Sequence, residues 1–208
     1  MVKIFPQGLL ETNTYVVWNE LFSECMVVDC GVEPKTVLPF IEEQKLFVKY
    51  VVLTHGHFDH AHYVEEYEKT FPDAKIICHE NEKVILFDPE ANLSTYIDTP
   101  RAYSCNYTYV TEGDCLSLCK KSGEECMNFQ VLSTPGHTPG CICLYDEVDK
   151  IMFTGDTLFK KSFGRTDFKY GNSQDLYLSL NRLYRMDKDI LFYPGHYGSS
   201  TIGEETKR

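Results

Sequence analysis

The stretch Thr54-His55-Gly56-His57-Phe58-Asp59-His60 places three histidines and one aspartate within six consecutive positions. It follows a mostly apolar run, 48–53, which has the composition of a buried strand. The pattern H-x-H-x-D-H would arise by chance in roughly one chain in two thousand of this length, so coincidence explains it poorly. Imidazole and carboxylate ligands suit zinc, manganese or iron, and a loop at a strand end can direct several of them inward. The motif therefore predicts a metal site; a solvated histidine-rich loop is the alternative.

Length and composition are those of one globular domain spanning residues 1–208. The chain has 208 residues, of which 43% are apolar. Neither the N-terminus nor any other window has the apolar length of a signal peptide or a membrane span, so we expect a cytoplasmic protein without a membrane partner. The formal net charge of -11 disfavours a nucleic-acid partner, because such binding depends largely on Lys and Arg contacting phosphates.

The cysteines give a further indication of the compartment. There are nine of them, an odd number, and none has C-x-x-C spacing. We therefore expect reduced thiols in a reducing compartment and no disulfide framework. Cys141 and Cys143 are two positions apart, so they would share one face of a strand as buried apolar residues, not as metal ligands.

Short strands alternate with a few helices, and no low-complexity linker divides the chain. The predicted strands are 2–5, 14–18, 25–28, 49–53, 75–78, 115–118, 129–132, 141–145, 151–153 and 190–193. The predicted helices are 34–43, 61–69, 81–87 and 173–185. The last helix has the clearest pattern, with leucines at helical spacing behind a Ser173 cap. We expect 88–109 to be a long loop with one helical turn, and the whole pattern predicts two packed sheets covered by helices.

Two further histidines lie in glycine and proline turns at predicted strand ends: His137 in Thr134-Pro135-Gly136-His137-Thr138-Pro139-Gly140 and His196 in Tyr193-Pro194-Gly195-His196. Between them, the apolar run 151–153 leads to Asp156, and a carboxylate at the end of a buried strand needs a partner or a metal. A turn histidine taken alone is more often a cap or a surface residue. Together with the first cluster, these residues make five histidines and two aspartates, enough for two metals if one carboxylate bridges.

The order of these motifs, H-x-H-x-D-H, T-P-G-H-T-P-G, F-T-G-D-T-L-F and P-G-H, resembles the metallo-β-lactamase superfamily over nearly the whole chain. The resemblance implies an αββα sandwich, with two packed sheets flanked by helices and two metals at the open edge between the sheets. By this likeness His55, His57 and His137 would bind the first metal, Asp59, His60 and His196 the second, and Asp156 both. His60 in place of Arg, and the absence of a matching Cys ligand, disfavour the commonest secreted β-lactamases.

Within the superfamily, Gly164-Arg165-Thr166-Asp167 and the segment from Pro194 to Glu204 resemble the short form of glyoxalase II, the hydroxyacylglutathione hydrolases. That likeness implies a small-molecule thioester substrate such as S-D-lactoylglutathione. The C-terminal helical extension that helps full-length members recognise glutathione is not found before Arg208. Arg165 is the candidate contact for a substrate anion, with Lys160 or Lys161 as further candidates, and a local ion pair with Asp167 is an equal alternative. Tyr197 could line the pocket, although an ordinary packed aromatic is the favoured alternative.

The resemblance also implies a mechanism. Two divalent metals, zinc in the first place and iron or manganese as alternatives, would share Asp156 and supply a bridging hydroxide, which Asp59 would orient. The main alternative is an iron-dependent persulfide dioxygenase of the same fold, in which His55, His137 and Asp156 would bind one metal. A metal-binding protein without catalysis is a third possibility. His62 and His79 are expected to have solvated or supporting roles, and the oligomeric state is left open.

Overall fold

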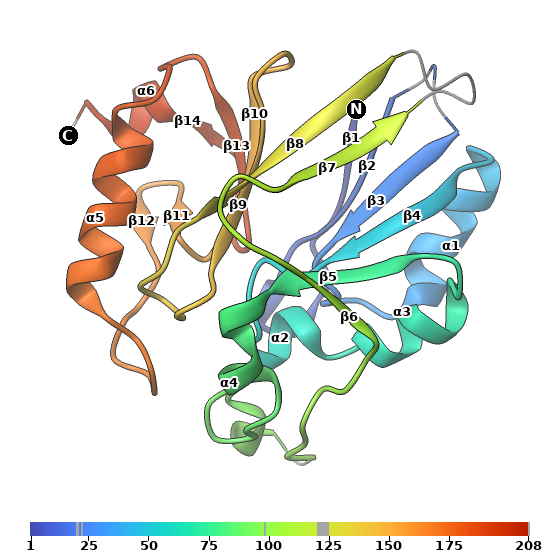
Figure 1. The fold of residues 1–208 in the computed structure, drawn as a ribbon, viewed down its shortest axis with the longest axis horizontal. Coiled ribbons are helices and arrows are strands. Elements are labelled where there is room, and N and C mark those ends of the chain that lie inside the picture. Colours follow the sequence, from blue (N-terminus) through green and yellow to red (C-terminus); the bar gives the residue numbers. More distant parts are fainter. Residues whose placement is uncertain (20, 22, 98, 120–124, 208) are drawn as a thin grey trace.

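The computed structural model describes residues 1–19, 21, 23–97, 99–119 and 125–207. Within these residues two six-stranded sheets pack face to face, and helices cover their outer faces. Figure 1 shows α5 on one side, α1 and α3 on the other, and the two sheets between them. The predicted αββα sandwich is confirmed.

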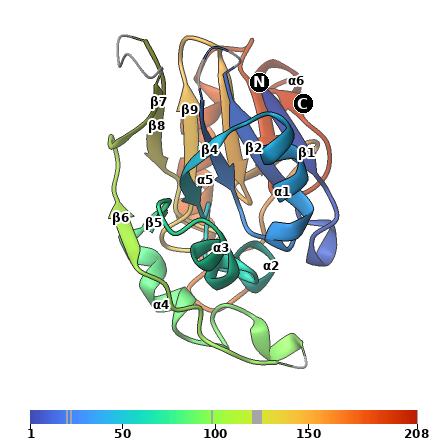
Figure 2. The same cartoon turned by 90° about the vertical axis from the view of Figure 1, so that its right-hand side faces the viewer.

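The first sheet has the strand order β1-β2-β3-β4-β5-β6. Its strands are β1 (Val2–Phe5), β2 (Thr14–Trp18), β3 (Glu24–Val28), β4 (Phe47–Val52), β5 (Lys75–His79) and β6 (Tyr107–Val110). Strands β3 to β6 run parallel, so helical connections return the chain to the same end of the sheet. Helices α1 (Pro34–Glu43) and α3 (Val64–Thr70) make two of these returns, and Figure 2 shows them together over one face.

The second sheet has the order β14-β13-β10-β9-β8-β7. Its strands are β7 (Cys115–Cys119), β8 (Cys126–Ser133), β9 (Ile142–Asp146), β10 (Ile151–Gly155), β13 (Leu191–Pro194) and β14 (Ser200–Thr201). Helix α5 (Ser173–Tyr184) covers its outer face, because Leu176, Leu180 and Leu183 recur at helical spacing and pack on the sheet. The short hairpin β11 (Leu158–Phe159) and β12 (Ser162–Phe163) follows β10, and α6 (Ile202–Glu205) follows β14.

The main core lies between the two sheets. Residues of alternate positions in β2 and β3 face residues of β8, β9 and β10, as the two-residue period of a strand requires. Phe153 is fully buried there, and its ring lies 5.2 Å from that of Tyr15, 5.3 Å from that of Tyr193 and 6.1 Å from that of Phe129. This interior fixes the two sheets relative to each other, and so fixes the loops at their common edge.

Most predicted elements are present; the ends of 2–5, 14–18 and 34–43 are as predicted, and most other ends differ by at most three residues. The predicted helix 61–69 is instead two helices, α2 (Phe58–Ala61) and α3, and the predicted helix 81–87 is a 3-10 turn, Glu80–Glu82, followed by α4 (Lys83–Leu86). The cap of α5 is Asn172 and not Ser173, because the Asn172 side chain accepts hydrogen bonds from the backbone N–H groups of the first turn. The predicted loop 88–109 contains a 3-10 turn (Ser94–Tyr96) and ends in strand β6, which was missed.

The prediction that all nine cysteines are free thiols was wrong for one pair. Cys119 and Cys126 form a disulfide between β7 and β8, where antiparallel pairing brings the two residues opposite each other. Seven other cysteines are free, and Cys141 and Cys143 are buried as predicted. No helix in the described part of the chain is both long and apolar enough to cross a membrane.

Candidate metal centre

All seven predicted ligands lie together where loops leave the two sheets. They are His55 and His57 after β4, Asp59 and His60 in α2, His137 between β8 and β9, Asp156 after β10, and His196 after β13. Six are buried and His196 is half-buried. The ends of strands from both sheets therefore converge on one cluster of imidazoles and carboxylates.

The potential ligand atoms form three overlapping groups, each with its atoms within 4.8 Å of one another. One group, the first trio, consists of His55, His57 and His137, and another, the second trio, consists of Asp59, His60 and His196. The remaining group joins them and consists of His55, His60 and Asp156. Asp156 lies between the two trios: its Oδ2 atom is 3.5 Å from Nε2 of His137, and its Oδ1 atom is 3.3 Å from Nε2 of His60.

Three buried polar atoms of the cluster have no hydrogen-bond partner among the described residues: Nε2 of His57, Nε2 of His137 and Oδ1 of Asp156. An unsatisfied buried polar atom costs about 1–3 kcal/mol, so three at one place require an explanation. All three belong to the expected ligands, and imidazole with carboxylate is a donor set typical of zinc or iron. The cluster therefore fits bound divalent metal.

Burial keeps the first trio in the form that binds metals. Burial lowers the pKa of His57 to about 3, with a further contribution from the neighbouring His137, and it lowers the pKa of His55 well below its ordinary value. Burial also lowers the pKa of His137. At neutral pH these three imidazoles are uncharged, and neutral imidazole is the metal-binding form.

In the second trio the pKa values of the histidines are raised and not lowered. Burial disfavours protonated His196, but hydrogen bonds to Asp156 and Asp59 outweigh that effect and raise its pKa to about 9. The pKa of His60 is raised well above its ordinary value because nearby carboxylates outweigh burial. The same histidines overcome the effect of burial on Asp59 and Asp156 and lower the pKa values of both carboxyl groups. Without metal, the histidines of the second trio are protonated, and their positive charge balances the carboxylates as a metal cation would.

Residues outside the cluster orient its members. Asp29 accepts a hydrogen bond from Nδ1 of His60 at 2.9 Å, and the backbone carbonyl of Arg165 accepts one from Nδ1 of His137 at 2.7 Å. Because a carbonyl only accepts, Nδ1 of His137 must carry the proton, and Nε2 is free to bind a metal. The Thr12 hydroxyl donates to Oδ2 of Asp59 at 2.6 Å.

These supporting contacts were not predicted from the sequence. Asp29 follows the buried strand β3, so it carries the same signal that identified Asp156 and could have been found in that way. Thr12 lies 47 positions from Asp59, and no local pattern marks such a contact.

Gly195 permits the close approach of the last loop. A Cβ atom at this position would overlap Oδ1 of Asp156 and would lie 2.6 Å from Cε1 of His60. The backbone N–H of Gly195 donates to the carbonyl of Gly155 at 2.8 Å, which ties the loop of His196 to the loop of Asp156. Only glycine leaves room for both ligands here.

A pocket of about 360 Å³ opens onto the cluster. Besides ligand residues and Ser162, it is lined by a mostly apolar set, namely Leu10, Phe58, Leu93, Phe159, Phe163, Phe168 and Tyr197, together with Arg165. Tyr197 lies at the rim, with 68% of its surface exposed, and its ring is 5.7 Å from that of Phe159. An apolar wall beside a polar floor is typical of a small-molecule site.

Arg165 lines this pocket and also makes the local ion pair considered from the sequence. Its guanidinium donates to both carboxylate oxygens of Asp167, at 2.9 and 2.6 Å, and lies over the ring of Phe168. Lys160 and Lys161 line a different hollow, beside Glu204 and Glu205.

The two remaining histidines have other surroundings. His79 accepts from the backbone N–H of Asn81 at 3.1 Å and contacts the Ser133 hydroxyl, so it satisfies a loop as predicted. The ring of His62 lies against Tyr63, outside the ligand cluster.

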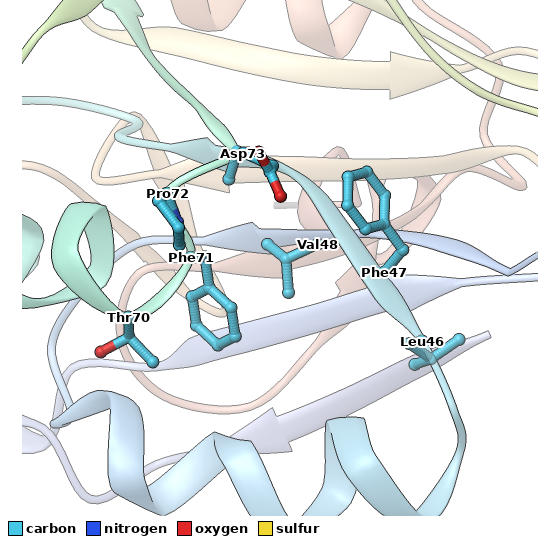
Figure 3. A pocket seen from close by; sticks show the side chains of 8 residues that line it. Leu46, Phe47, Val48, Thr70, Phe71, Pro72 and Asp73 are labelled. Carbon is cyan, nitrogen blue, oxygen red and sulfur yellow. The ribbon is translucent and has the colours of Figure 1, made fainter.

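Another hollow, of about 200 Å³, lies beside the start of β4 (Figure 3). Phe47 and Val48, at the start of β4, line it together with Phe71 and Pro72. The predicted ligands His55 and His57 follow the opposite end of the same strand. This hollow therefore does not belong to the candidate site.

Comparison with known proteins gives a consistent result. The sequence profile of the metallo-beta-lactamase superfamily matches residues 8–196. A relative named hydroxyacylglutathione hydrolase GloC, from Haemophilus influenzae, is 31% identical over 209 residues, which cover 99% of this chain and 95% of the relative.

Solved structures agree. A B3 metallo-beta-lactamase named BLEG-1 superposes with a TM-score of 0.87 at 30% identity, covering 100% of this chain and 97% of that one. The protein TTHA1623, solved in a di-iron-bound form, superposes with a TM-score of 0.81 at 29% identity, covering 98% and 97% of the two chains. The chain belongs to the metallo-β-lactamase superfamily.

Proposed function

We propose that this protein is a binuclear metal-dependent hydrolase of thioesters, acting on S-D-lactoylglutathione or a related hydroxyacyl thioester. The observation that carries the proposal is the position of Asp156. Its carboxylate lies 3.5 Å from His137 of the first trio and 3.3 Å from His60 of the second. A carboxylate between two three-residue ligand sets is the arrangement needed to join two divalent ions.

The proposed division of ligands follows the two trios. His55, His57 and His137 would hold one ion, Asp59, His60 and His196 the other, and Asp156 both. When bound, two such ions would supply an activated water and polarise a carbonyl oxygen at neutral pH. We propose zinc for both ions. Iron is an alternative, because a relative 29% identical was solved with two irons, and manganese is another.

The residues of the chain would contribute positioning and the exclusion of water. Thr12 donates to Oδ2 of Asp59, the oxygen that also lies 3.4 Å from Nε2 of His60 and 3.2 Å from Nε2 of His196, and so would help to hold this carboxylate in its direction toward the cluster. The apolar pocket wall, including Phe159 and Phe168, would shield the thioester from bulk water. A thiolate is a good leaving group, so the reaction needs less help from a general acid than amide hydrolysis does.

Two observations bear on the substrate. The relative GloC is named for hydroxyacylglutathione hydrolysis, which supports a hydroxyacyl thioester. Arg165 and Tyr197 are the proposed contacts at the mouth of the pocket, but the charge of Arg165 is already balanced by Asp167. We therefore propose that the acyl group and thioester are recognised near the cluster, and that the anionic ends of the thiol carrier contribute less.

The same features support a small-molecule partner. A pocket of about 360 Å³ is suited to a small molecule, and the net charge of -11 does not suit a nucleic acid. We propose a cytoplasmic enzyme with a small-molecule thioester as its partner.

The test is hydrolysis of S-D-lactoylglutathione by zinc-reconstituted protein, followed as loss of thioester absorbance. Asp59→Ala should abolish turnover, whereas Asp73→Ala, the same change at an exposed position, should leave it unchanged. A β-lactam should be assayed in parallel, because BLEG-1 is a B3 metallo-beta-lactamase. Preference for the β-lactam, or no thioester turnover above the Asp59→Ala background, would refute the proposal. Oxygen uptake on glutathione persulfide with one iron bound would support the dioxygenase alternative.

A further inference from the structure

Glu82 is a fully buried carboxylate that the proposed reaction does not use. It ends the 3-10 turn that follows β5, directly before α4. Its Oε2 atom accepts a hydrogen bond from the backbone N–H of Gly56 at 2.6 Å. Its Oε1 atom accepts two more, from the Thr138 hydroxyl at 2.6 Å and from the backbone N–H of Gly140 at 2.7 Å.

All three donors lie in the loops that carry expected metal ligands, and Gly140 lies three positions after His137. Gly56 lies between His55 and His57, and Thr138 directly follows His137. These residues belong to two loops from different sheets, one after β4 and the other after β8. One carboxylate therefore connects the two loops that carry the whole first trio.

The glycines of both loops are packed against this carboxylate. A Cβ atom at Gly56 would lie 2.9 Å from Oε2 of Glu82, and one at Gly140 would lie 2.8 Å from Oε1. Contacts this short would force the loops away from Glu82. The two glycines thus allow the backbone amides to reach the carboxylate directly.

The burial of Glu82 has a cost that its partners only partly offset. All three partners are uncharged, and burial raises the pKa of the carboxyl group to about 7, against the effect of the three hydrogen bonds. A neutral amide in its place would not be equivalent. The Gln side chain has one oxygen for two backbone N–H groups on opposite sides, so either Gly56 or Gly140 would lose its acceptor.

We infer that Glu82 is a positioning residue for the first trio: it ties the His55–His57 loop to the His137 loop and so sets the spacing of three metal ligands. The inference rests on the proposed function, because it takes this trio to be a metal site. The second trio is supported separately by Thr12, which donates to Asp59, whereas Asp29 contacts both His60 and Thr54, the residue before His55. Loss of Glu82 should therefore weaken one of the two metal sites and not the other.

The test is metal binding, measured without substrate. Zinc is titrated into metal-free protein against a chromophoric chelator, and two ¹¹³Cd NMR signals report the two sites. Glu82→Gln should weaken metal binding by the first trio by about 10- to 100-fold, as loss of a residue that supports metal ligands typically does. It should change the affinity of the second trio by less than about twofold. Glu80→Gln, the same change two residues away at an exposed position, should bind as the wild type does.

Two more variants complete the test. Thr12→Val removes the donor to Asp59 and should give the reverse result, weakening only the site of the second trio. Thr138→Val removes one of the three donors and should weaken the first site by about fivefold, the effect of one lost hydrogen bond, even if Glu82→Gln does not fold.

Wild-type affinity at the first site in Glu82→Gln or in Thr138→Val would overturn the inference. Equal weakening at both sites would also overturn it, because that result indicates a general structural role. A wild-type protein that binds two ions but hydrolyses no thioester would refute the proposed function alone, since the inference is decided by metal affinity.

Discussion

The two metal sites should respond differently to pH. The perturbation is a change of pH from 9 to 6 during zinc titration of the metal-free protein. His196 has a pKa of about 9, raised by hydrogen bonds to Asp156 and Asp59 that outweigh burial, whereas burial lowers that of His57 to about 3. Only neutral imidazole binds zinc, so a proton must leave His196 but not His57.

The magnitude follows from these two values. Well below pH 9 each unit of acidification should weaken the second site by about tenfold, and because His196 is half protonated at pH 9 the loss between pH 9 and pH 6 should be about 500-fold. The raised pKa of His60 acts in the same direction. The first site should change by less than about twofold over the same range, because its histidines are already neutral. Affinity of the second site therefore rises with pH and levels off above 9.

The assay is calorimetric zinc titration at several pH values, repeated in two buffers with different heats of ionisation to count the protons released. The first zinc should release few protons at pH 7.5, and the second should release at least about one. Equal slopes of affinity against pH for both ions, or no proton release with the second, would refute the electrostatic account of the two trios.

Four other changes test separate parts of the structure. Asp156→Ala should abolish turnover and reduce the bound metal below two ions per chain, measured by elemental analysis. Gly195→Ala should lower kcat by about 100-fold with an unchanged circular dichroism spectrum, because the new Cβ displaces Asp156. Phe153→Ala should lower the free energy of unfolding by about 3–5 kcal/mol in urea, because it leaves a cavity between the sheets. Arg165→Gln should raise KM for S-D-lactoylglutathione by less than about tenfold and leave kcat unchanged, since Asp167 already balances its charge.

Each of these predictions has a contradicting result. Near-normal turnover in the Asp156 variant would exclude a binuclear mechanism, and near-normal kcat in the Gly195 variant would show that the loop can move aside. If the Phe153 variant unfolds at the same urea concentration as the wild type, Phe153 does not belong to the core that stabilises the two sheets. A large fall in kcat on changing Arg165 would give that residue a direct part in the chemistry.

The sequence predicted the sheets and the seven clustered residues because their signals are local. Buried strands such as β4 and β10 are short apolar runs, and the candidate ligands follow them within a few positions. His137 and His196 were weaker cases, and only their combination with the first motif, together with the family resemblance, identified them.

The residues that support the cluster could not be found in this way. Glu82 is 26 positions from Gly56 and 58 from Gly140, and nothing in its own segment distinguishes it from the exposed Glu80. Strand β6 was missed because its residues are largely accessible and lie in a segment without a clear period. The pairing of Cys119 with Cys126 depends on the register of β7 and β8. A count of cysteines gives no information about that register.

The most direct test of the binuclear hydrolase is activity measured against metal content. Metal-free protein is titrated with zinc while hydrolysis of S-D-lactoylglutathione is followed at each addition. Because both trios and Asp156 are required, turnover should stay near background through the first equivalent and rise to its maximum as the second binds. Full activity at one equivalent, or none at two, would contradict the account.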